Sequence, residues 1–423
     1  MNTKTKNRPS RSSSGSTRRN TFSNHKFGHS KFNSNNNKRR DLSRSGGGGR
    51  RGGRKIPTFD PSQFINTNPV NVVEETYKPK HNFGTFGLNP KLVEKIASLK
   101  LEIPSPIQDQ IIPEILKGND VIGIAETGTG KTAAFLIPLI EKTIKDGNRQ
   151  TLILAPTREL ALQINEELLQ LSRGFGIYST VCVGGINIRP QIKSLSRKNH
   201  FVIGTPGRVL DLIKRKSFVP SKITTVVLDE ADRMLDMGFI NDMRSILSQT
   251  PQNRETLFFS ATITKETEGL VHDFLRNPTT ISVKKKDVAN NISQDVVRFE
   301  HNSRFEKLLE LLLNTEFKRV LIFGAMKHSV AKLATQLTAG GVLSESIHGN
   351  KSHIQRQRAL KSFKEGKVRI LVATDVAARG IHIDNVTHVI NYDLPSTFED
   401  YVHRIGRTGR GTNRGKALTF ISK

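Results

Sequence analysis

One short glycine-rich segment has the residue types that bind a nucleotide phosphate, namely Ala125, Glu126, Thr127, Gly128, Thr129, Gly130, Lys131 and Thr132. Glycine lets main-chain N–H groups turn toward a phosphate, and the N-terminus of a following helix adds a favourable dipole. Lys131 would then reach the β- and γ-phosphates, and the Thr132 hydroxyl would ligate Mg²⁺. The general phosphate-loop pattern has glycine where this chain has Ala125, and an ordinary glycine-rich turn is the alternative interpretation.

A second apolar run, 223–228, leads into the segment Asp229-Glu230-Ala231-Asp232, which contains three acids. An acid at the end of a buried strand is placed to hold Mg²⁺, usually through water, and a neighbouring carboxylate can orient or deprotonate an attacking water. The alternative is a pair of solvated acids that cap the next helix. Because a phosphate-loop pattern lies upstream in the same chain, we favour the hydrolytic interpretation.

The elements that must position these residues follow a β-α rhythm from about Tyr77 onward, because short apolar runs alternate with amphipathic stretches. Such a rhythm with near-continuous apolar strands predicts parallel sheets covered on both faces, whose ligands bind at the carboxyl ends of the strands. A polar run at 284–294 interrupts the rhythm and is interpreted as a linker. The expected strands are 120–125, 150–156, 180–183, 200–204, 225–230 and 256–261 before it, and 319–325, 346–349, 368–375, 387–393 and 416–422 after it.

Charge divides the chain of 423 residues further. Its 66 Lys and Arg exceed its 38 Asp and Glu, which gives a formal net charge of +28 and favours a polyanionic partner. Residues 1–55 contribute +15 of this charge, with sixteen Lys or Arg against Asp41 alone. Because this Ser-, Asn-, Gly- and Arg-rich stretch has too few apolar groups to offset chain entropy, we expect it to be disordered. It is either a solubilising tail or an electrostatic tether for nucleic acid.

Several protein classes are excluded by simple counts. The longest apolar run, 133–140, has eight residues, well short of the ~18 that a membrane span needs. The basic N-terminus is followed by no apolar segment of the kind found in secretory signals. The single cysteine, Cys182, cannot form an internal disulfide, which fits a reducing compartment.

From Phe83 to the C-terminus, the motifs in their order resemble those of the DEAD-box ATP-dependent RNA helicases. The family signature stands at 229–232, and Ala at position 125 is usual in this family's phosphate loop. The resemblance implies an α/β fold of two tandem RecA-like, doubly wound parallel-sheet domains. The implied organisation is a disordered basic arm at 1–75, an ATP-binding domain at 76–283, the linker at 284–294 and a C-terminal helicase domain at 295–423.

The resemblance also implies ATP and Mg²⁺ as cofactors and assigns residues to them. Gln108, in a segment like the family's Q motif, would bond the adenine edge, and Phe83 would cover the base. Thr132 and Asp229 would hold Mg²⁺, the Asp through water. The catalytic residues would be Lys131, Asp229, Glu230, Arg407 and Arg410, with the two arginines contacting the γ-phosphate. A solvated basic helix is the simpler interpretation of those arginines taken alone.

Other matching motifs imply contacts with RNA that do not read its bases. The expected RNA-binding residues are Pro156, Thr157, Arg158, Gly184, Gly185, Thr205, Pro206, Gly207 and Arg208 in the first domain, and His348, Gly349, Arg356 and Thr374 in the second. Residues expected to couple the ATP state to the grip on RNA are Ser260, Thr262, Asp232, His403 and Arg404. Two positions depart from the family pattern: His382 replaces an Asp that contacts the ribose, and His353 replaces a Gln.

The expected function is RNA-stimulated ATP hydrolysis coupled to non-processive unwinding or remodelling of RNA or ribonucleoprotein complexes. The site would be split between two domains, so that hydrolysis requires their closure. The expected partner is RNA, bound without sequence specificity, and no membrane association is expected. The protein is expected to be a monomer. A segment like that of the bacterial RhlE-type branch, at 348–352, implies a cytoplasmic location, although Lys38-Arg39-Arg40 would also suit nuclear import. Alternatives are a nucleic-acid annealing protein that depends on the basic arm, and a DNA-directed helicase.

Overall fold

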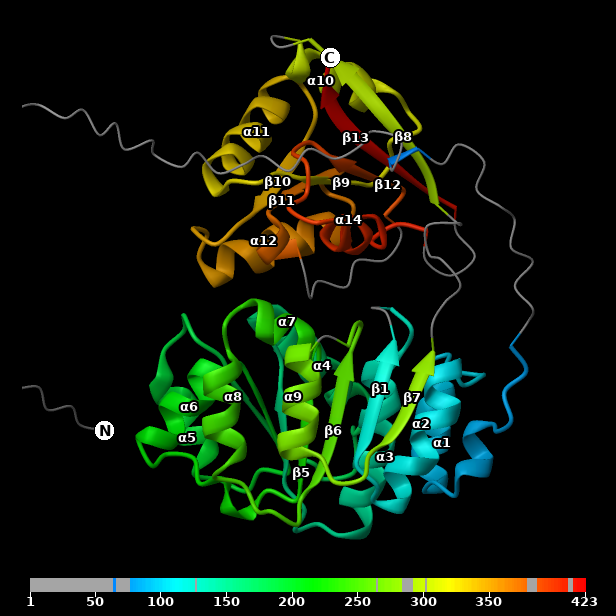
Figure 1. Cartoon of the computed structure of the whole chain (residues 1–423), viewed down its shortest axis with the longest axis vertical. Helices are drawn as coiled ribbons and strands as arrows, with labels where there is room; N and C mark the ends of the chain where they lie inside the picture. The colour runs from blue at the N-terminus through cyan, green and yellow to red at the C-terminus, as the bar shows by residue number, and fades with distance from the viewer. Residues whose placement is uncertain are drawn as a thin grey trace, which may run out of the picture. The chain divides into compact units, whose positions relative to one another are not determined.

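A computed structural model describes residues 64–65, 77–125, 128–263, 265–283, 292–300, 303–378, 386–409 and 414–423. They form two α/β domains, each built on a parallel sheet, so the predicted fold class is confirmed (Figure 1). Apart from Phe64 and Ile65, the arm expected at 1–75 lies outside the described residues. Within the described ranges, no helix combines the length and the apolar character needed to cross a bilayer.

The first domain contains a seven-stranded sheet in the order β3-β4-β2-β5-β6-β1-β7, in which all neighbouring strands are parallel. Its strands are β1 (Val121–Ala125), β2 (Thr151–Leu154), β3 (Ser179–Cys182), β4 (Phe201–Gly204), β5 (Thr225–Leu228), β6 (Glu255–Ser260) and β7 (Thr279–Val283).

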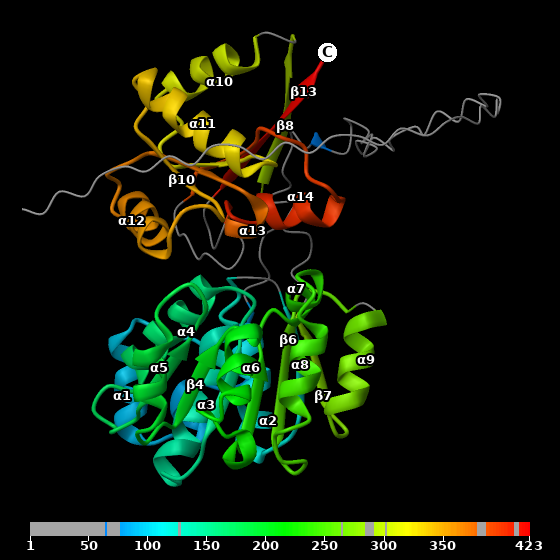
Figure 2. The same ribbon diagram turned by 90° about the vertical axis from the view of Figure 1, so that its left-hand side faces the viewer.

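Helices cover both faces of this sheet (Figure 2). One face packs against α1 (Pro90–Ser98), α2 (Pro106–Lys117), α3 (Lys131–Lys145) and α4 (Arg158–Leu171). The other packs against α5 (Ile188–Leu195), α6 (Pro206–Lys214), α7 (Ala231–Asp236), α8 (Ile240–Leu247) and α9 (Lys265–Phe274). Two short 3₁₀ turns, η2 (Phe83–Phe86) and η3 (Pro220–Lys222), complete the domain. Because a covered parallel sheet is buried on both faces, its central strands, such as β1, β2 and β5, are predominantly apolar.

The second domain contains a six-stranded parallel sheet in the order β10-β11-β9-β12-β13-β8. Its strands are β8 (Ile292–Phe299), β9 (Val320–Phe323), β10 (Ser344–Ile347), β11 (Ile370–Ala373), β12 (His388–Asn391) and β13 (Gly415–Ser422). On one face lie α10 (Arg304–Leu313) and α11 (Lys327–Ala339), and on the other α12 (His353–Lys364), α13 (Asp375–Ala378) and α14 (Phe398–Ile405).

The start of β8 corrects the expected linker. Residues 292–294, assigned to the linker at 284–294, pair with residues 415–417 of β13 and belong to the second sheet. β8 is an edge strand, in which only Ile292 and Gln294 are buried, and it lacks the continuous apolar run of a central strand. The rest of the linker lies outside the described residues.

Phe64 corrects the expected arm. The side chain is fully buried, and its ring packs edge to face on Tyr401 of α14 with centroids 4.7 Å apart. Ile292, Ile405 and Ala417 complete this apolar cluster on the second domain. The expectation of disorder across 1–75 is therefore wrong at this residue. A single aromatic ring buries a large apolar area, and the average composition of the stretch does not reveal such a contact.

Candidate active site

The phosphate loop and the acids of 229–232 meet at the carboxyl edge of the first sheet. The loop follows β1, the acids follow β5, and β6 lies between these two strands. A cavity of about 560 Å³ opens there and is lined from both sides, by Gly128, Gly130, Lys131 and Thr132 of the loop and by Asp229 and Glu230. The fold thus brings together two predicted segments that lie about 100 residues apart in the sequence. Glu126 and Thr127 lie outside the described residues, and Thr129 is partly buried.

Lys131 is held in place by the phosphate loop itself. It is buried at the first position of α3, and its Nζ donates a hydrogen bond to the carbonyl oxygen of Ala125 at 2.6 Å. Gly130 caps this helix in a left-handed conformation (φ 91°), and a Cβ there would lie 2.5 Å from Nε2 of Gln108. Only glycine suits the position, since both the backbone angle and the contact exclude a side chain.

Gln108 connects the predicted adenine side of the site to this loop. Its Nε2 donates to the carbonyl oxygen of Gly130 at 3.1 Å, and its Oε1 accepts from the main-chain N–H of Ser105 at 2.9 Å. Phe83, expected to cover the base, is buried in the core of the first domain and packs edge to face on Phe86. Gln108 therefore contacts the phosphate loop directly, and Phe83 lies in the apolar core of the first domain.

An acidic anchor next to Gln108 was missed from the sequence. The Asp109 carboxylate accepts hydrogen bonds from the Tyr77 hydroxyl, from the main-chain N–H groups of Lys80 (2.9 Å) and His81 (3.0 Å), and pairs with Nδ1 of His81 at 2.7 Å. These contacts fasten the segment that carries Phe83 onto α2. The only sequence signal was an acid that directly follows Gln108 in the first turn of α2.

Two carboxyl groups that line the cavity have a strongly raised pKa. Burial raises the pKa of Asp229 to about 7, although nearby Lys131 acts in the opposite direction. Burial and the charge of Asp229 likewise raise the pKa of Glu167, on α4, to about 7. Glu167 lines the same cavity and was not predicted from the sequence. Glu230 adopts a left-handed backbone (φ 50°), which costs about 1–3 kcal/mol in a non-glycine residue and is typical of functional positions.

These groups fit a hydrated magnesium ion. The buried Asp229 carboxyl favours its neutral form in this structure, and a divalent cation beside it would favour the ionised form. Within the described residues, no three acidic, His or Cys side chains gather closely enough to hold a metal by themselves. That arrangement suits Mg²⁺, which keeps several waters and is shared between one or two protein oxygens and phosphates.

Three of the expected coupling residues form one cluster. Oδ2 of Asp232 accepts hydrogen bonds from the main-chain N–H groups of Ala261 (2.9 Å) and Thr262 (3.1 Å). The Ser260 hydroxyl donates to the carbonyl oxygen of Thr262 at 2.6 Å. The acidic motif after β5 is therefore bonded directly to the turn after β6.

The expected RNA contacts of the first domain gather at the carboxyl ends of β2, β3 and β4. The Arg158 guanidinium lies over the glycine pair, and a Cβ at Gly185 would lie 1.7 Å from its Nη1. Arg208 donates to the carbonyl oxygen of Ile186. Thr157, after Pro156, caps α4 by accepting from the main-chain N–H of Leu160 at 3.2 Å. In the same way Thr205 precedes α6, which begins with Pro206 and Gly207.

The expected residues of the second domain lie after β10 and β11 and on α12. His348 is buried, and among the described residues neither of its ring nitrogens has a hydrogen-bond partner. Burial and nearby cations lower the pKa of its imidazole. Gly349 follows it against the stem of Lys327, Thr374 is buried after β11, and Arg356 lies on α12. His353 begins α12, whereas His382 lies outside the described residues.

Arg404 is fixed within the second domain. Its guanidinium forms two parallel hydrogen bonds with Asp375 (2.6 and 2.7 Å) and further bonds with Asn391 and the carbonyl of Asp393. This side chain therefore ties α13 to α14. His403 lies beside it on α14, and Arg407 is buried after that helix. Arg410 lies outside the described residues.

Comparisons with protein families and curated relatives identify the family of this chain. A model of the DEAD/DEAH box helicases matches residues 105–270, and a model of the helicase conserved C-terminal domain matches residues 303–412. ATP-dependent RNA helicase CshA of Listeria monocytogenes is 45% identical over 341 residues, which cover 80% of this chain and 66% of the relative. CshA of Bacillus subtilis is 44% identical over 342 residues, which cover 80% of this chain and 69% of the relative. This chain thus spans about two thirds of the length of the curated relatives it matches, and these carry the name CshA and not RhlE.

Solved structures of similar proteins contain RNA and nucleotide. The structure of S. cerevisiae Dbp5 bound to RNA and ADP BeF3 has a TM-score of 0.72 at 32% identity, with 81% of this chain and 89% of that chain covered. Mss116p bound to single-stranded RNA and AMP-PNP has a TM-score of 0.74 at 29% identity, with 82% and 76% covered. These likenesses extend over both domains.

Proposed function

Because this chain belongs to the DEAD-box family of ATP-dependent RNA helicases, we propose that it couples RNA-stimulated ATP hydrolysis to local, non-processive unwinding or remodelling of RNA duplexes or ribonucleoprotein complexes. The observation that carries the proposal is the cavity in which Lys131 and Thr132 of the phosphate loop face Asp229 and Glu230. A phosphate-binding loop opposite a carboxylate pair is the arrangement that nucleotide hydrolysis requires.

In the proposed mechanism, the loop N–H groups and Lys131 bind the phosphates, and Gln108 binds the adenine edge. Thr132 and Asp229 would hold Mg²⁺, which neutralises phosphate charge when bound. Glu230 orients the attacking water and accepts its proton. Arg407 and Arg410 of the second domain stabilise charge on the transferred phosphoryl group, an effect on the order of 10³–10⁵ in rate.

RNA would stimulate hydrolysis by favouring closure of the two domains. The support in the first domain is the surface formed by Arg158, Gly184, Gly185 and Arg208, which presents cationic groups and bare main-chain N–H groups to a phosphate backbone. Contacts of this kind grip a strand without reading its sequence. We further propose that the basic arm attracts RNA and that the protein acts as a cytoplasmic monomer of the RhlE-type branch.

The experiment compares ATP hydrolysis by the purified full chain with and without RNA. We expect strong stimulation by RNA in the wild type and loss of hydrolysis in Glu230→Gln and Lys131→Ala. The exposed Glu94→Gln, on α1 and outside the lining of the cavity, is the matched control and should retain activity. Equal hydrolysis with and without RNA, together with full activity of Glu230→Gln, would refute the proposal.

A chain that begins at Ile56 separates the helicase from an annealing protein. We expect strand separation to persist without residues 1–55 and to vanish in Lys131→Ala, because the two domains contain the ATP site. If the only activity is annealing and it disappears with the arm, the annealing alternative is correct. Parallel assays with DNA duplexes test the DNA-directed alternative.

A further inference from the structure

A second cavity of the first domain lies at the opposite edge of the sheet from the nucleotide site. It has a volume of about 620 Å³ and is lined by residues at the starts of β5 and β6, by the end of α3 and by the loop after α2. Because all strands are parallel, these amino ends face away from the carboxyl ends that carry the phosphate loop and the acids. The proposed function assigns no role to this cavity.

The lining of this cavity is strongly cationic. Seven Lys or Arg side chains line it against two carboxylates, a formal excess of five positive charges. The cations come from separate segments, for example Lys117 at the end of α2, Lys142 on α3, Lys222 in η3 and Arg276 after α9. They therefore converge on one space instead of following a line along the surface.

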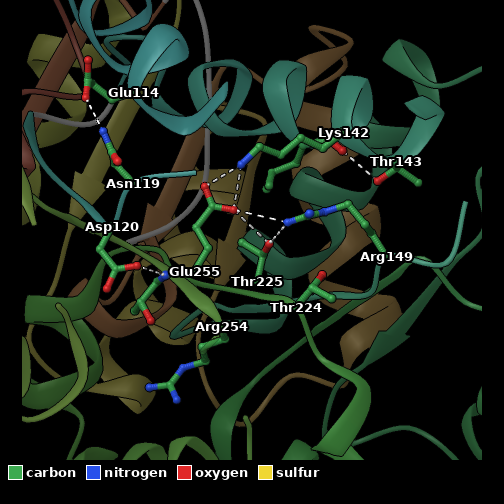
Figure 3. Close-up of polar contacts among 12 residues, drawn as sticks. Glu114, Asn119, Asp120, Lys142, Thr143, Arg149, Thr224, Thr225, Arg254 and Glu255 are labelled. Atoms are coloured by element: carbon green, nitrogen blue, oxygen red, sulfur yellow. Dashed lines mark hydrogen bonds and ion pairs between the residues drawn. The ribbon is translucent and has the colours of Figure 1, made fainter. Parts of the chain in front are cut away.

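The buried carboxylate of the cavity, Glu255, already has partners within the first domain (Figure 3). Glu255 accepts from Nζ of Lys142 at 2.8 and 2.9 Å and from the Thr225 hydroxyl at 3.2 Å, and it pairs with Arg149 at 3.5 Å. Asp120, beyond the rim, accepts the main-chain N–H groups of Thr256 and Arg276, both at 2.7 Å. Asp146, the second carboxylate of the lining, is exposed and accepts the main-chain N–H of Asn148 at 3.0 Å. Within the described residues, none of these three acids forms an ion pair with the remaining cations of the lining.

Three lining cations form no ion pair with an acid among the described residues: Lys222, Arg254 and Arg276. Arg254 is the most informative, because it is only 7% exposed. Its Nη1 and Nη2 donate to the carbonyl oxygens of Pro251 and Phe274, while its Nε is buried with no hydrogen-bond partner. Asp120 compensates part of the charge of this buried guanidinium, but it forms no ion pair with Arg254 and already accepts two main-chain N–H groups. A buried guanidinium with incomplete charge compensation is costly and favours an anion from outside the chain.

We propose that this cavity binds a small anion that carries several phosphate groups. The volume falls in the range of about 300–1,000 Å³ that is usual for small-molecule sites. Guanidinium groups bond phosphate oxygens in a fixed fork, and Lys supplies mobile point charge, so the lining suits clustered phosphates. A compact ligand is favoured over an RNA strand because the cations surround a concavity and do not form an extended track.

The test uses the absence of tryptophan from the chain. Asn253 is exposed and lines the cavity, so Asn253→Trp introduces one fluorophore there. Inorganic tripolyphosphate is then titrated into the full chain without Mg²⁺. The Lys131→Ala substitution in the same protein removes binding at the phosphate loop. Tripolyphosphate bound by the basic arm would lie far in sequence from the fluorophore. We expect a saturable change in tryptophan emission both with Lys131 present and in the Lys131→Ala protein.

Matched charge removals locate the binding. Lys222→Gln with Arg276→Gln should weaken tripolyphosphate binding at least about tenfold, which corresponds to about 1.4 kcal/mol. The control pair, Lys91→Gln with Lys95→Gln on α1, removes the same charge away from the cavity and should change the affinity less than about twofold. Lys222→Gln alone provides a milder variant if the double variant unfolds.

Three results would overturn the proposal. One is an emission that tripolyphosphate leaves unchanged. Another is an equal loss of affinity in the two charge-removal pairs, which would mean attraction to net charge alone. The third is a response to single-stranded RNA but not to tripolyphosphate, which would make the cavity an RNA contact. Loss of ATP hydrolysis affects none of these readouts, so the site is tested independently of the proposed function.

Discussion

The Asp232 carboxylate accepts a hydrogen bond from the main-chain N–H of Thr262 at 3.1 Å. This bond joins the acidic motif after β5 to the turn after β6, so neither segment can shift without the other. The same oxygen also accepts from the Thr262 hydroxyl at 3.3 Å. Asp232 is thereby placed to transmit a change at the nucleotide to a neighbouring strand end.

We expect Asp232→Asn to uncouple hydrolysis from unwinding. An amide presents one acceptor oxygen where the carboxylate presents two, and its NH₂ group would face N–H donors. RNA unwinding should fall about tenfold, with ATP hydrolysis in the absence of RNA reduced much less, which parallel assays measure. The exposed Asp236→Asn, at the end of α7, is the control. Equal losses of both activities would contradict a coupling role.

Gln108→Glu should weaken ATP binding. The substitution removes the Nε2 donor and places a carboxylate oxygen against the carbonyl of Gly130, so the phosphate loop loses a support as well as an adenine contact. A rise of about tenfold in the dissociation constant of a fluorescent ATP analogue is the expected result. Gln110→Glu makes the same change at an exposed position of α2 and should leave the affinity unchanged.

The stability of the nucleotide-free protein should fall as the pH rises from about 5 to 7. Asp229 and Glu167 hold protons in the folded state up to a pKa of about 7, whereas the unfolded chain has released them by then, so folding is favoured at the lower pH. Glu167→Gln should weaken this pH dependence and raise the melting temperature at pH 8, because it removes one of two repelling carboxylates. Thermal unfolding without Mg²⁺ measures both effects. Glu166→Gln, the exposed neighbour, should behave like the wild type.

Phe64→Ala should destabilise the second domain by about 3–5 kcal/mol, because it leaves a cavity against Tyr401 and Ile405. Urea unfolding followed by hydrogen exchange in β8, β13 and α14 would locate the loss. Ile65→Ala is the matched control, since Ile65 is 48% exposed and should contribute little. Unchanged exchange in α14 of Phe64→Ala would show that the ring contributes nothing to the second domain.

The central strands were predictable because burial on both faces requires continuous apolar runs, as in 151–154 and 320–323. Neither β7 nor β8 was predicted as a strand, because these two edge strands mix apolar with polar residues. The phosphate loop and the acidic motif could be found since each is contiguous in sequence. Glu167, Asp109 and the cationic cavity depend on residues brought together only by folding.

The burial of Phe64 also sets a limit on how far the protein can extend. Phe64 is attached to the second domain, and Tyr77 is bonded to Asp109 in the first. Thirteen residues of extended chain span at most about 45 Å, so these two attachment points stay within that distance while Phe64 is docked. The domains are therefore joined twice, once after β7 and once through the N-terminal segment. If the Phe64 ring left its site, the N-terminal segment would no longer join the two domains, and only the connection after β7 would remain.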